Sequence, residues 1–157
     1  MFRRKNKNNP LYESIETIKQ LRRELGLLMN ESHSRKLLNS LVKNMPVAVV
    51  IFSSLDGSII STNKLFAGII GKKESEILGN RLLSFCYHKD LLRVSDAMNT
   101  AEKTEWEIGA RVIHSTGNVW VRFVFRIEKS IILTGYNYVF VIPVTSVEEI
   151  KNLENAI

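Results

Sequence analysis

Two stretches in the second half of the chain alternate between apolar and polar residues. The apolar positions are Trp106, Ile108, Ala110 and Val112 in the first, and Val119, Val121, Phe123, Phe125 and Ile127 in the second. A period of two predicts a β-strand with one buried face, and the polar residues 115–118 between the stretches predict a turn. The chain must therefore fold around a long antiparallel hairpin that needs a packing layer on its apolar face.

Three further strands are expected. The β-branched run 47–53, the Asp-Gly pair at 56–57 and residues 59–60 form a hairpin signal, because Asp-Gly readily adopts the positive φ of a tight turn. Residues 138–144 are apolar at both parities, which predicts a central strand covered on both faces. Residues 62–102 show short helical patterns instead. Strands at both ends with helices between them predict an α+β fold: one antiparallel sheet with helices on one face.

The region before the first strand, residues 10–45, predicts a helical segment. Asn9 and Pro10 form a good helix start, since Asn caps free amides and Pro is favoured at the first helical position. Apolar residues then recur at helical spacing but lose phase over residues 30–34, where we expect a break or hinge. They are Ile18, Leu21, Leu25 and Leu28 before the break, and Leu38, Leu41 and Met45 after it. The pattern favours a dimerising coiled coil, with an amphipathic helix packed on its own domain as the alternative.

The net charge is confined to this N-terminal region. Residues 1–45 hold ten basic and four acidic residues, the rest of the chain holds twelve of each, and the total is +6. We expect a basic, disordered tail over residues 1–9. Contact with nucleic acid or an acidic membrane is a weak alternative function of this tail, because short basic ends more often stay solvated. The residues concerned are Arg3, Arg4, Lys5 and Lys7.

Several classes of protein are disfavoured by the composition. The single Cys86 excludes a disulfide within one chain, and one Cys and three His residues offer no zinc spacing. The longest apolar run, residues 45–52, falls well short of the ~20 residues of a spanning helix, so we expect a cytoplasmic protein. The sequence shows no nucleophile with a base and no phosphate-binding glycine loop. We therefore predict no metal site and no enzyme activity, any catalytic output lying in a missing or separate domain.

Residues 35–157 resemble the PAS (Per-Arnt-Sim) sensory family. The motifs, in the family's order, are the Asp-Gly pair at 56–57 with Asn63, Phe66 and Gly71, then Glu-Ile-Leu-Gly at 76–79, His-Lys-Asp at 88–90, and Gly117 with Trp120. The resemblance implies a five-stranded antiparallel sheet of order 2-1-5-4-3 with short helices on one face. It also implies N-terminal and C-terminal flanking helices that dimerise and carry signal. The PAS-like core would span residues 46–145, and a C-terminal linker helix would start within residues 146–157.

The junction after the last strand departs from the family pattern. Members commonly close that strand with Asp-Ile-Thr, and here the corresponding residues are Pro143, Val144 and Thr145. Proline supplies neither a carboxylate nor an amide hydrogen to anchor the output helix. The signal would then leave by another route, such as the N-terminal helix, or this copy would serve dimerisation more than sensing. Residues 146–149 form a capping box for a final helix with Ile150 and Leu153 on its apolar seam.

PAS pockets hold a flavin, a haem, a small acid or only side chains. We expect the pocket to be lined by Phe66, Ile70, Leu82, Val121, Phe123, Val139 and Val141. Light-sensing flavin members have Cys where this chain has Leu82, and these apolar side chains cannot hydrogen-bond a flavin ring. Haem is disfavoured because the long helix, residues 90–102, contains no axial histidine, and His88 at its opening fits a turn. We predict no cofactor and an apolar pocket, filled by its own side chains or by an apolar small molecule.

Three arginines lie on the opposite parity of the long strands. Arg111, Arg122 and Arg126 could form an anion clamp, but Glu105, Glu107 and Glu128 interleave with them. A solvated or helix-covered outer face with cross-strand ion pairs is the favoured interpretation.

The resemblance predicts a PAS-like sensory and dimerisation module of a bacterial-type signalling protein, such as a two-component histidine kinase, a diguanylate cyclase or a transcription regulator. We expect a homodimer that works with an output domain or a partner signalling protein. The dimer and signal helices would use Ile18, Leu21, Leu25, Leu28, Leu38, Leu41, Ile150 and Leu153, with Pro143 and Thr145 at the junction. The alternative is a stand-alone PAS-like protein that binds a partner in trans.

Overall fold

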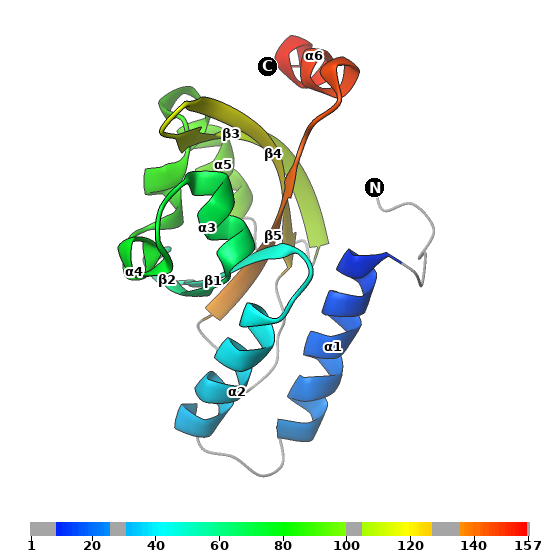
Figure 1. Cartoon of the computed structure of the whole chain (residues 1–157), viewed down its shortest axis with the longest axis vertical. Coiled ribbons are helices and arrows are strands. Elements are labelled where there is room, and N and C mark those ends of the chain that lie inside the picture. The colour runs from blue at the N-terminus through cyan, green and yellow to red at the C-terminus, as the bar shows by residue number, and fades with distance from the viewer. Residues whose placement is uncertain (1–8, 26–30, 100–104, 127–135, 157) are drawn as a thin grey trace.

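The computed structural model of the chain describes residues 9–25, 31–99, 105–126 and 136–156. Its centre is one antiparallel sheet of five strands, in the predicted order β2-β1-β5-β4-β3 (Figure 1). The strands are β1 (Ala48–Ser53), β2 (Ile59–Thr62), β3 (Glu105–His114), β4 (Gly117–Arg126) and β5 (Tyr136–Pro143). The predicted α+β class and the predicted strand order are both confirmed.

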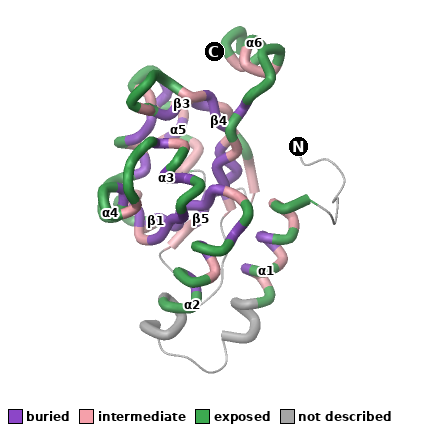
Figure 2. The backbone as a smooth tube through the Cα atoms, in the orientation of Figure 1, coloured by how far each residue is buried: buried purple, intermediate pink, exposed green. Residues whose placement is uncertain are grey.

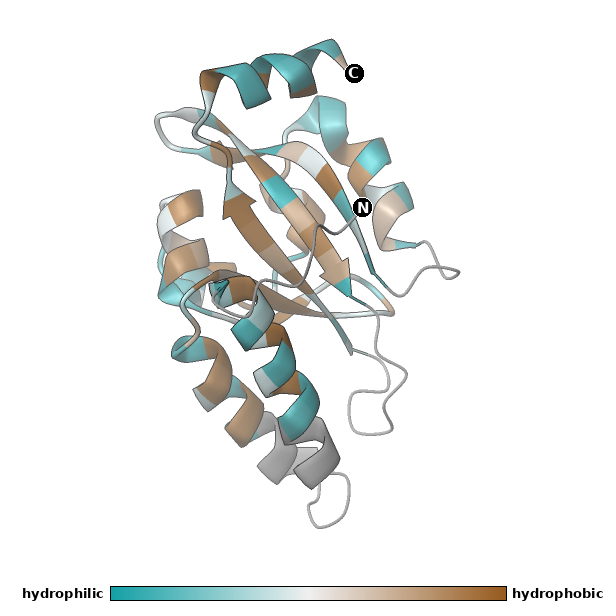
Figure 3. Cartoon of the chain, turned by 90° about the vertical axis from the view of Figure 1, so that its right-hand side faces the viewer, coloured by the Kyte–Doolittle hydropathy of each residue, from teal (hydrophilic) through white to brown (hydrophobic). Residues whose placement is uncertain are grey.

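The central strand β5 is buried from both sides. It pairs with β1 on one edge and with β4 on the other. Its residues Tyr138, Val139, Phe140 and Val141 are each at most 1% exposed, although successive side chains point to opposite faces. Figure 3 shows β5 as hydrophobic along most of its length. The prediction of a doubly covered central strand is therefore confirmed.

The inner face of the sheet is covered by the short helices. They are α3 (Lys64–Ile70), α4 (Glu74–Ile77), the 3-10 turns η1 (Leu82–Phe85) and η2 (His88–Asp90), and α5 (Leu91–Met98). The cup closes over a core rich in aromatic side chains, in which Phe66 meets Phe85 and Phe52 meets Phe125, both edge to face. The buried Asn63 fixes the start of α3, because its Oδ1 accepts the Phe66 N–H at 3.2 Å.

The outer face of the sheet is covered at one end by α1 (Pro10–Leu25) and α2 (Glu31–Lys43) (Figures 1 and 2). A second hydrophobic cluster joins these helices to the sheet. Its buried members are Ile15, Ile18, Leu38, Val42, Met45, Val49, Ile51, Val124, Tyr138 and Phe140. The predicted helix start is confirmed, since the side chain of Asn9 accepts the Leu11 N–H at 2.9 Å.

This packing bears on the predicted dimer seam. Ile18 is 1% exposed and Leu38 is 8% exposed, both against the chain's own sheet, as in the alternative interpretation of the sequence. A dimer built on these two side chains would require α1 and α2 to leave the sheet. Leu41 is half-buried beside the same cluster. The side chains of Leu21, Leu25 and Leu28 lie outside the described residues.

The predicted hinge over residues 30–34 is misplaced. Residues 31–34 belong to α2, and residue 30 lies outside the described part. The helices α1 and α2 each bury apolar residues against the sheet, so the change in apolar phase along the sequence does not by itself locate a hinge.

The remaining part of the outer face carries α6 (Val147–Asn155) (Figure 3). Ser146 caps this helix as predicted, and its hydroxyl accepts the Glu149 N–H at 3.4 Å. At the junction, Pro143 still pairs with Val121, and the Val144 N–H donates to the Trp120 carbonyl at 2.9 Å. The strand ladder therefore continues past the proline, while Thr145 is exposed.

Adjacent leucines on α2 provide a matched test of this architecture. Leu38→Ala should lower the free energy of unfolding by about 2–4 kcal/mol, because Leu38 is buried against the sheet. Leu37→Ala should cost less than about 1 kcal/mol, because Leu37 is 38% exposed. Urea unfolding at several protein concentrations measures both. Equal losses, or a Leu38→Ala loss that appears only at concentrations that favour a dimer, would contradict the intramolecular packing.

Candidate functional site

The seven residues predicted to line a pocket all lie inside the cup. Phe66, Ile70, Leu82, Val121, Phe123, Val139 and Val141 are each at most 1% exposed and belong to one packed cluster. Their inward orientation agrees with the predicted parity. These side chains form the apolar interior of the cup, and the binding of an apolar small molecule there remains a prediction.

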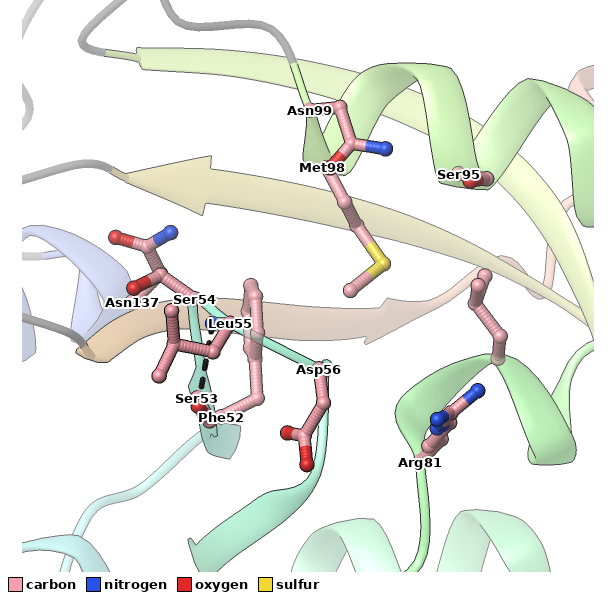
Figure 4. A pocket seen from close by; sticks show the side chains of 12 residues that line it. Phe52, Ser53, Ser54, Leu55, Asp56, Arg81, Ser95, Met98, Asn99 and Asn137 are labelled. Atoms are coloured by element: carbon pink, nitrogen blue, oxygen red, sulfur yellow. Dashed lines mark hydrogen bonds between the residues drawn. The ribbon is translucent and has the colours of Figure 1, made fainter.

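An open crevice lies beside this interior, at the β1–β2 turn (Figure 4). Its volume is about 280 Å³. Three parts of the chain form most of its wall: the turn after β1, the C-terminal half of α5 and the segment around η1. The lining residues are Phe52, Ser53, Ser54, Leu55, Asp56, Gly57, Arg81, Leu83, Ser95, Met98, Asn99 and Asn137. None of the seven predicted pocket residues is among them.

Two opposite charges line this crevice. The side chain of Asp56 accepts the Ser58 N–H at 2.9 Å, and this hydrogen bond, helped by the charge of Arg81, lowers the pKa of the Asp56 carboxyl. Arg81 interacts with this carboxylate electrostatically, but among the residues that the structure describes it forms no ion pair within 4.0 Å. The two backbones are held together, because Ser58 and Arg81 form a β-bridge and the Leu82 N–H donates to the Gly57 carbonyl at 3.0 Å.

A second polar cluster lies at the β3 edge of the sheet. The carboxylate of Asp90 is fully buried and accepts three hydrogen bonds from Arg111, at 2.8 Å from the backbone N–H, 2.9 Å from Nε and 2.7 Å from Nη2. Burial by itself raises the pKa of Asp90, but the hydrogen bonds from Arg111 and Arg93 outweigh it, so the net pKa is lowered. Although Asp90 directly precedes α5, its side chain makes no capping hydrogen bond to that helix, because the carboxylate is bound to β3.

Aromatic rings and a second arginine complete this edge cluster. The guanidinium of Arg111 lies 4.6 Å from the Tyr87 ring centroid and 4.7 Å from that of Trp120. Arg93 of α5 pairs with Asp90 at 3.1 Å and donates to the Gly109 carbonyl of β3. The cluster therefore ties α5 and the segment before it to the edge strand, through charge-assisted bonds that exclude water from Asp90.

Arg111 is bound to Asp90 and not, as had been predicted, to a glutamate of the strands, whereas Arg122 and Arg126 form the predicted cross-strand ion pairs. Arg122 pairs with Glu107 at 3.1 Å and Arg126 pairs with Glu105, both across β3 and β4. Arg122 also contacts Glu149 of α6, so the outer face is both ion-paired and helix-covered. Glu128 lies outside the described residues.

The remaining candidate residues lie apart from the crevice. Cys86 is buried, and burial followed by the Asp90 charge raises the pKa of its thiol to about 12. His88 is exposed in η2. The described residues contain no group of three potential metal ligands, and no described helix is long and apolar enough to cross a membrane. The basic residues at 3–7 lie outside the described part.

Sequence reasoning missed most of the crevice. The Asp-Gly turn at 56–57 was identified only as a hairpin signal, and Arg81 carried no pattern of its own. The signal that could have revealed the site is long-range: residues 57–59 hydrogen-bond to residues 79–82, which no local period encodes.

The buried Asp90 should dominate the acid stability of the domain. Asp90→Asn should lower the free energy of unfolding at pH 7 by about 3 kcal/mol, because Arg111 loses its buried counter-charge. Since folding lowers the pKa of Asp90, its contribution is complete above the unfolded pKa of about 3.9 and is lost as the pH falls through the lower, folded value. The difference between wild type and variant should therefore shrink below about pH 4.

Urea midpoints between pH 7 and pH 3 measure this effect, with the exposed Glu76→Gln as the control. A difference that stays constant across this range, or an Asp90→Asn variant as stable as Glu76→Gln at pH 7, would contradict the assigned role.

Comparison with known proteins gives matches only at the level of structure. The sequence matches no family model and no curated protein. The LOV protein of Rhodobacter sphaeroides superimposes with a TM-score of 0.64 at 12% identity, covering 77% of this chain and 72% of that one. The PAS domain of an HTR-like protein from Haloarcula marismortui gives a TM-score of 0.55 at 18% identity, with coverages of 72% and 93%.

A third similar structure is the PAS domain of the Cronobacter turicensis quorum-sensing receptor RpfR in complex with C12:0. It gives a TM-score of 0.54 at 16% identity and covers 63% of this chain and 94% of that one. The strand order and the cup of short helices are those that the PAS resemblance implied. The superpositions lead to the same assignment. The chain therefore has a PAS-like fold, as its sequence motifs predicted.

Proposed function

We propose that this chain is a sensory module of a bacterial-type signal-transduction protein, in which the crevice receives the signal and α6 passes it on. The observation that carries this proposal is the docking of α6 on β3, at the residue that also receives a hydrogen bond from α5. An input helix and an output helix therefore meet at Gly109. The output would be a histidine kinase, a diguanylate cyclase or a transcription regulator.

The input side of this route is α5. Ser95, Met98 and Asn99 at the C-terminal end of the helix line the crevice, and the Met98 methyl lies 3.4 Å from where a Cβ on Gly57 would stand. Arg93 is on the same short helix and donates to the Gly109 carbonyl. A molecule that displaces the end of α5 would therefore also move Arg93, because a helix of this length shifts as a unit.

The output side is α6. Leu153 occupies the space that a side chain at position 109 would fill, since a Cβ there would lie only 2.4 Å from the Leu153 Cδ2. Arg122 holds the preceding helical turn through Glu149, and no residue of α6 is fully buried. Few contacts of this kind give a low free energy of release, as a switch element requires. The sequence lacks the Asp that commonly anchors the output helix in the family. In the proposed route, the Leu153 and Glu149 contacts hold α6 instead.

The structural comparisons support a sensory function. One superimposed domain belongs to a quorum-sensing receptor and was solved with C12:0 bound. Dimerisation remains a prediction: with Ile18 and Leu38 buried in the chain's own core, a homodimer would use other surfaces or a rearranged N-terminal segment. A stand-alone module that acts on a partner in trans would use the same release of α6.

The contact between Leu153 of α6 and Gly109 of β3 can be tested by adding a single methyl group at position 109. Gly109→Ala should expel Leu153 and increase the amide exchange rate of residues 147–156 by about ten-fold or more, because the new Cβ occupies the Leu153 site. The exchange of β4 and β5 should remain slow. Hydrogen exchange with mass spectrometry reads both regions in one experiment.

The matched control is Gly68→Ala on α3, where a Cβ meets nothing within 4 Å. This variant should leave α6 exchange unchanged and be neutral or slightly stabilising. If Gly109→Ala and Gly68→Ala exchange alike along α6, the helix is not held by the Leu153 contact and the proposed output route fails.

A further inference from the structure

We propose that the crevice at the β1–β2 turn binds a small zwitterion of the amino-acid type, with its carboxylate at Arg81 and its ammonium group at Asp56. This inference rests on the proposed function, for which it names the class of input ligand. The crevice has three properties that together select such a molecule: its pair of charges, its size and the composition of its walls.

The charges are opposite and do not neutralise each other directly. Asp56 and Arg81 influence one another electrostatically, yet no nitrogen–oxygen distance between them is within 4.0 Å among the described contacts. Asp56 is anionic at neutral pH, like any aspartate of ordinary pKa, and the hydrogen bond from the Ser58 N–H stabilises the carboxylate further. A simple anion at Arg81 would face the Asp56 charge, and a simple cation would face Arg81. A molecule with both charges satisfies both side chains.

The backbone segments that carry the two charged residues are joined to each other. The bridge between Ser58 and Arg81 and the hydrogen bond from the Leu82 N–H to the Gly57 carbonyl connect them. The backbone on either side of the crevice therefore does not have to be ordered on binding, which lowers the entropic cost of binding a small ligand.

The size and walls of the crevice suit a small polar molecule. Its volume of about 280 Å³ is at the lower end of the range for small-molecule sites, roughly 300–1,000 Å³. Ser95, Asn99 and Asn137 offer neutral hydrogen-bonding groups on other walls of the crevice (Figure 4). Phe52 and Met98 supply an apolar side against which an uncharged side chain of the ligand could pack.

The test is calorimetric titration of the full chain with each of the standard L-amino acids, and with acetate and methylamine as small probes that carry one charge and no long apolar chain. At least one amino acid should bind saturably, and neither acetate nor methylamine should bind as tightly. Arg81→Gln and Asp56→Asn should each weaken binding about ten-fold or more, since each removes a charge-assisted contact. Asn at position 56 retains the oxygen that accepts the Ser58 N–H, so the turn should persist.

Lys64→Gln, an exposed residue of α3 outside the crevice, is the matched charge control and should bind as wild type does. The proposal is overturned if no amino acid binds, if acetate or methylamine binds more tightly than every amino acid, or if Arg81→Gln and Asp56→Asn leave the affinity unchanged. These outcomes are independent of the Gly109→Ala experiment, which needs no ligand. If no amino acid binds but Gly109→Ala releases α6, the zwitterion is rejected and the proposed sensory module is kept. If an amino acid binds but Gly109→Ala does not release α6, the output route is rejected.

Discussion

The structure depends on the burial of β5 from both faces. Because Tyr138 to Val141 are apolar at every position, the strand is stable only if each face of the sheet is covered. The cup of short helices covers one face, and α1 and α2 cover the other at the β1–β5 end. The N-terminal helices are thus part of the fold in this conformation. This requirement also leaves the β3–β4 end of the outer face as the place where α6 docks.

Two kinds of contact divide the molecule into a rigid part and a releasable part. The core clusters and the buried Asp90–Arg111 pair hold the sheet, the cup and the β3 edge together. By contrast, α6 has no buried residue of its own and is fixed by Leu153 and Glu149. Such a difference in local stability is what allows one element to detach while the rest stays folded. Arg93 connects the two parts, since it bonds both Asp90 and the Gly109 carbonyl.

Local patterns predicted the sheet well and the site poorly. The two-residue period of β3 and β4, the apolar β5 and the Asp-Gly turn each reflect backbone geometry over a few residues, and the structure confirms them. The surface on which α1 packs could not be predicted from local patterns. An apolar helix face has the same residue spacing whether it packs on another chain or on the sheet of its own chain. Arg81 and Gly109 were missed for a related reason: the residues that they lie near, Asp56 and Leu153, are distant in sequence.

The central claim is that the crevice and α6 are coupled through α5. The most direct measurement places a covalent group in the crevice: Ser95→Cys labelled with N-ethylmaleimide, which is selective because the native Cys86 is buried with a pKa of about 12. Labelling should increase the amide exchange of residues 147–156 several-fold, whereas the same label on Lys64→Cys should not. If the label at position 95 leaves α6 exchange unchanged while the domain stays folded, the crevice and the output helix are not coupled.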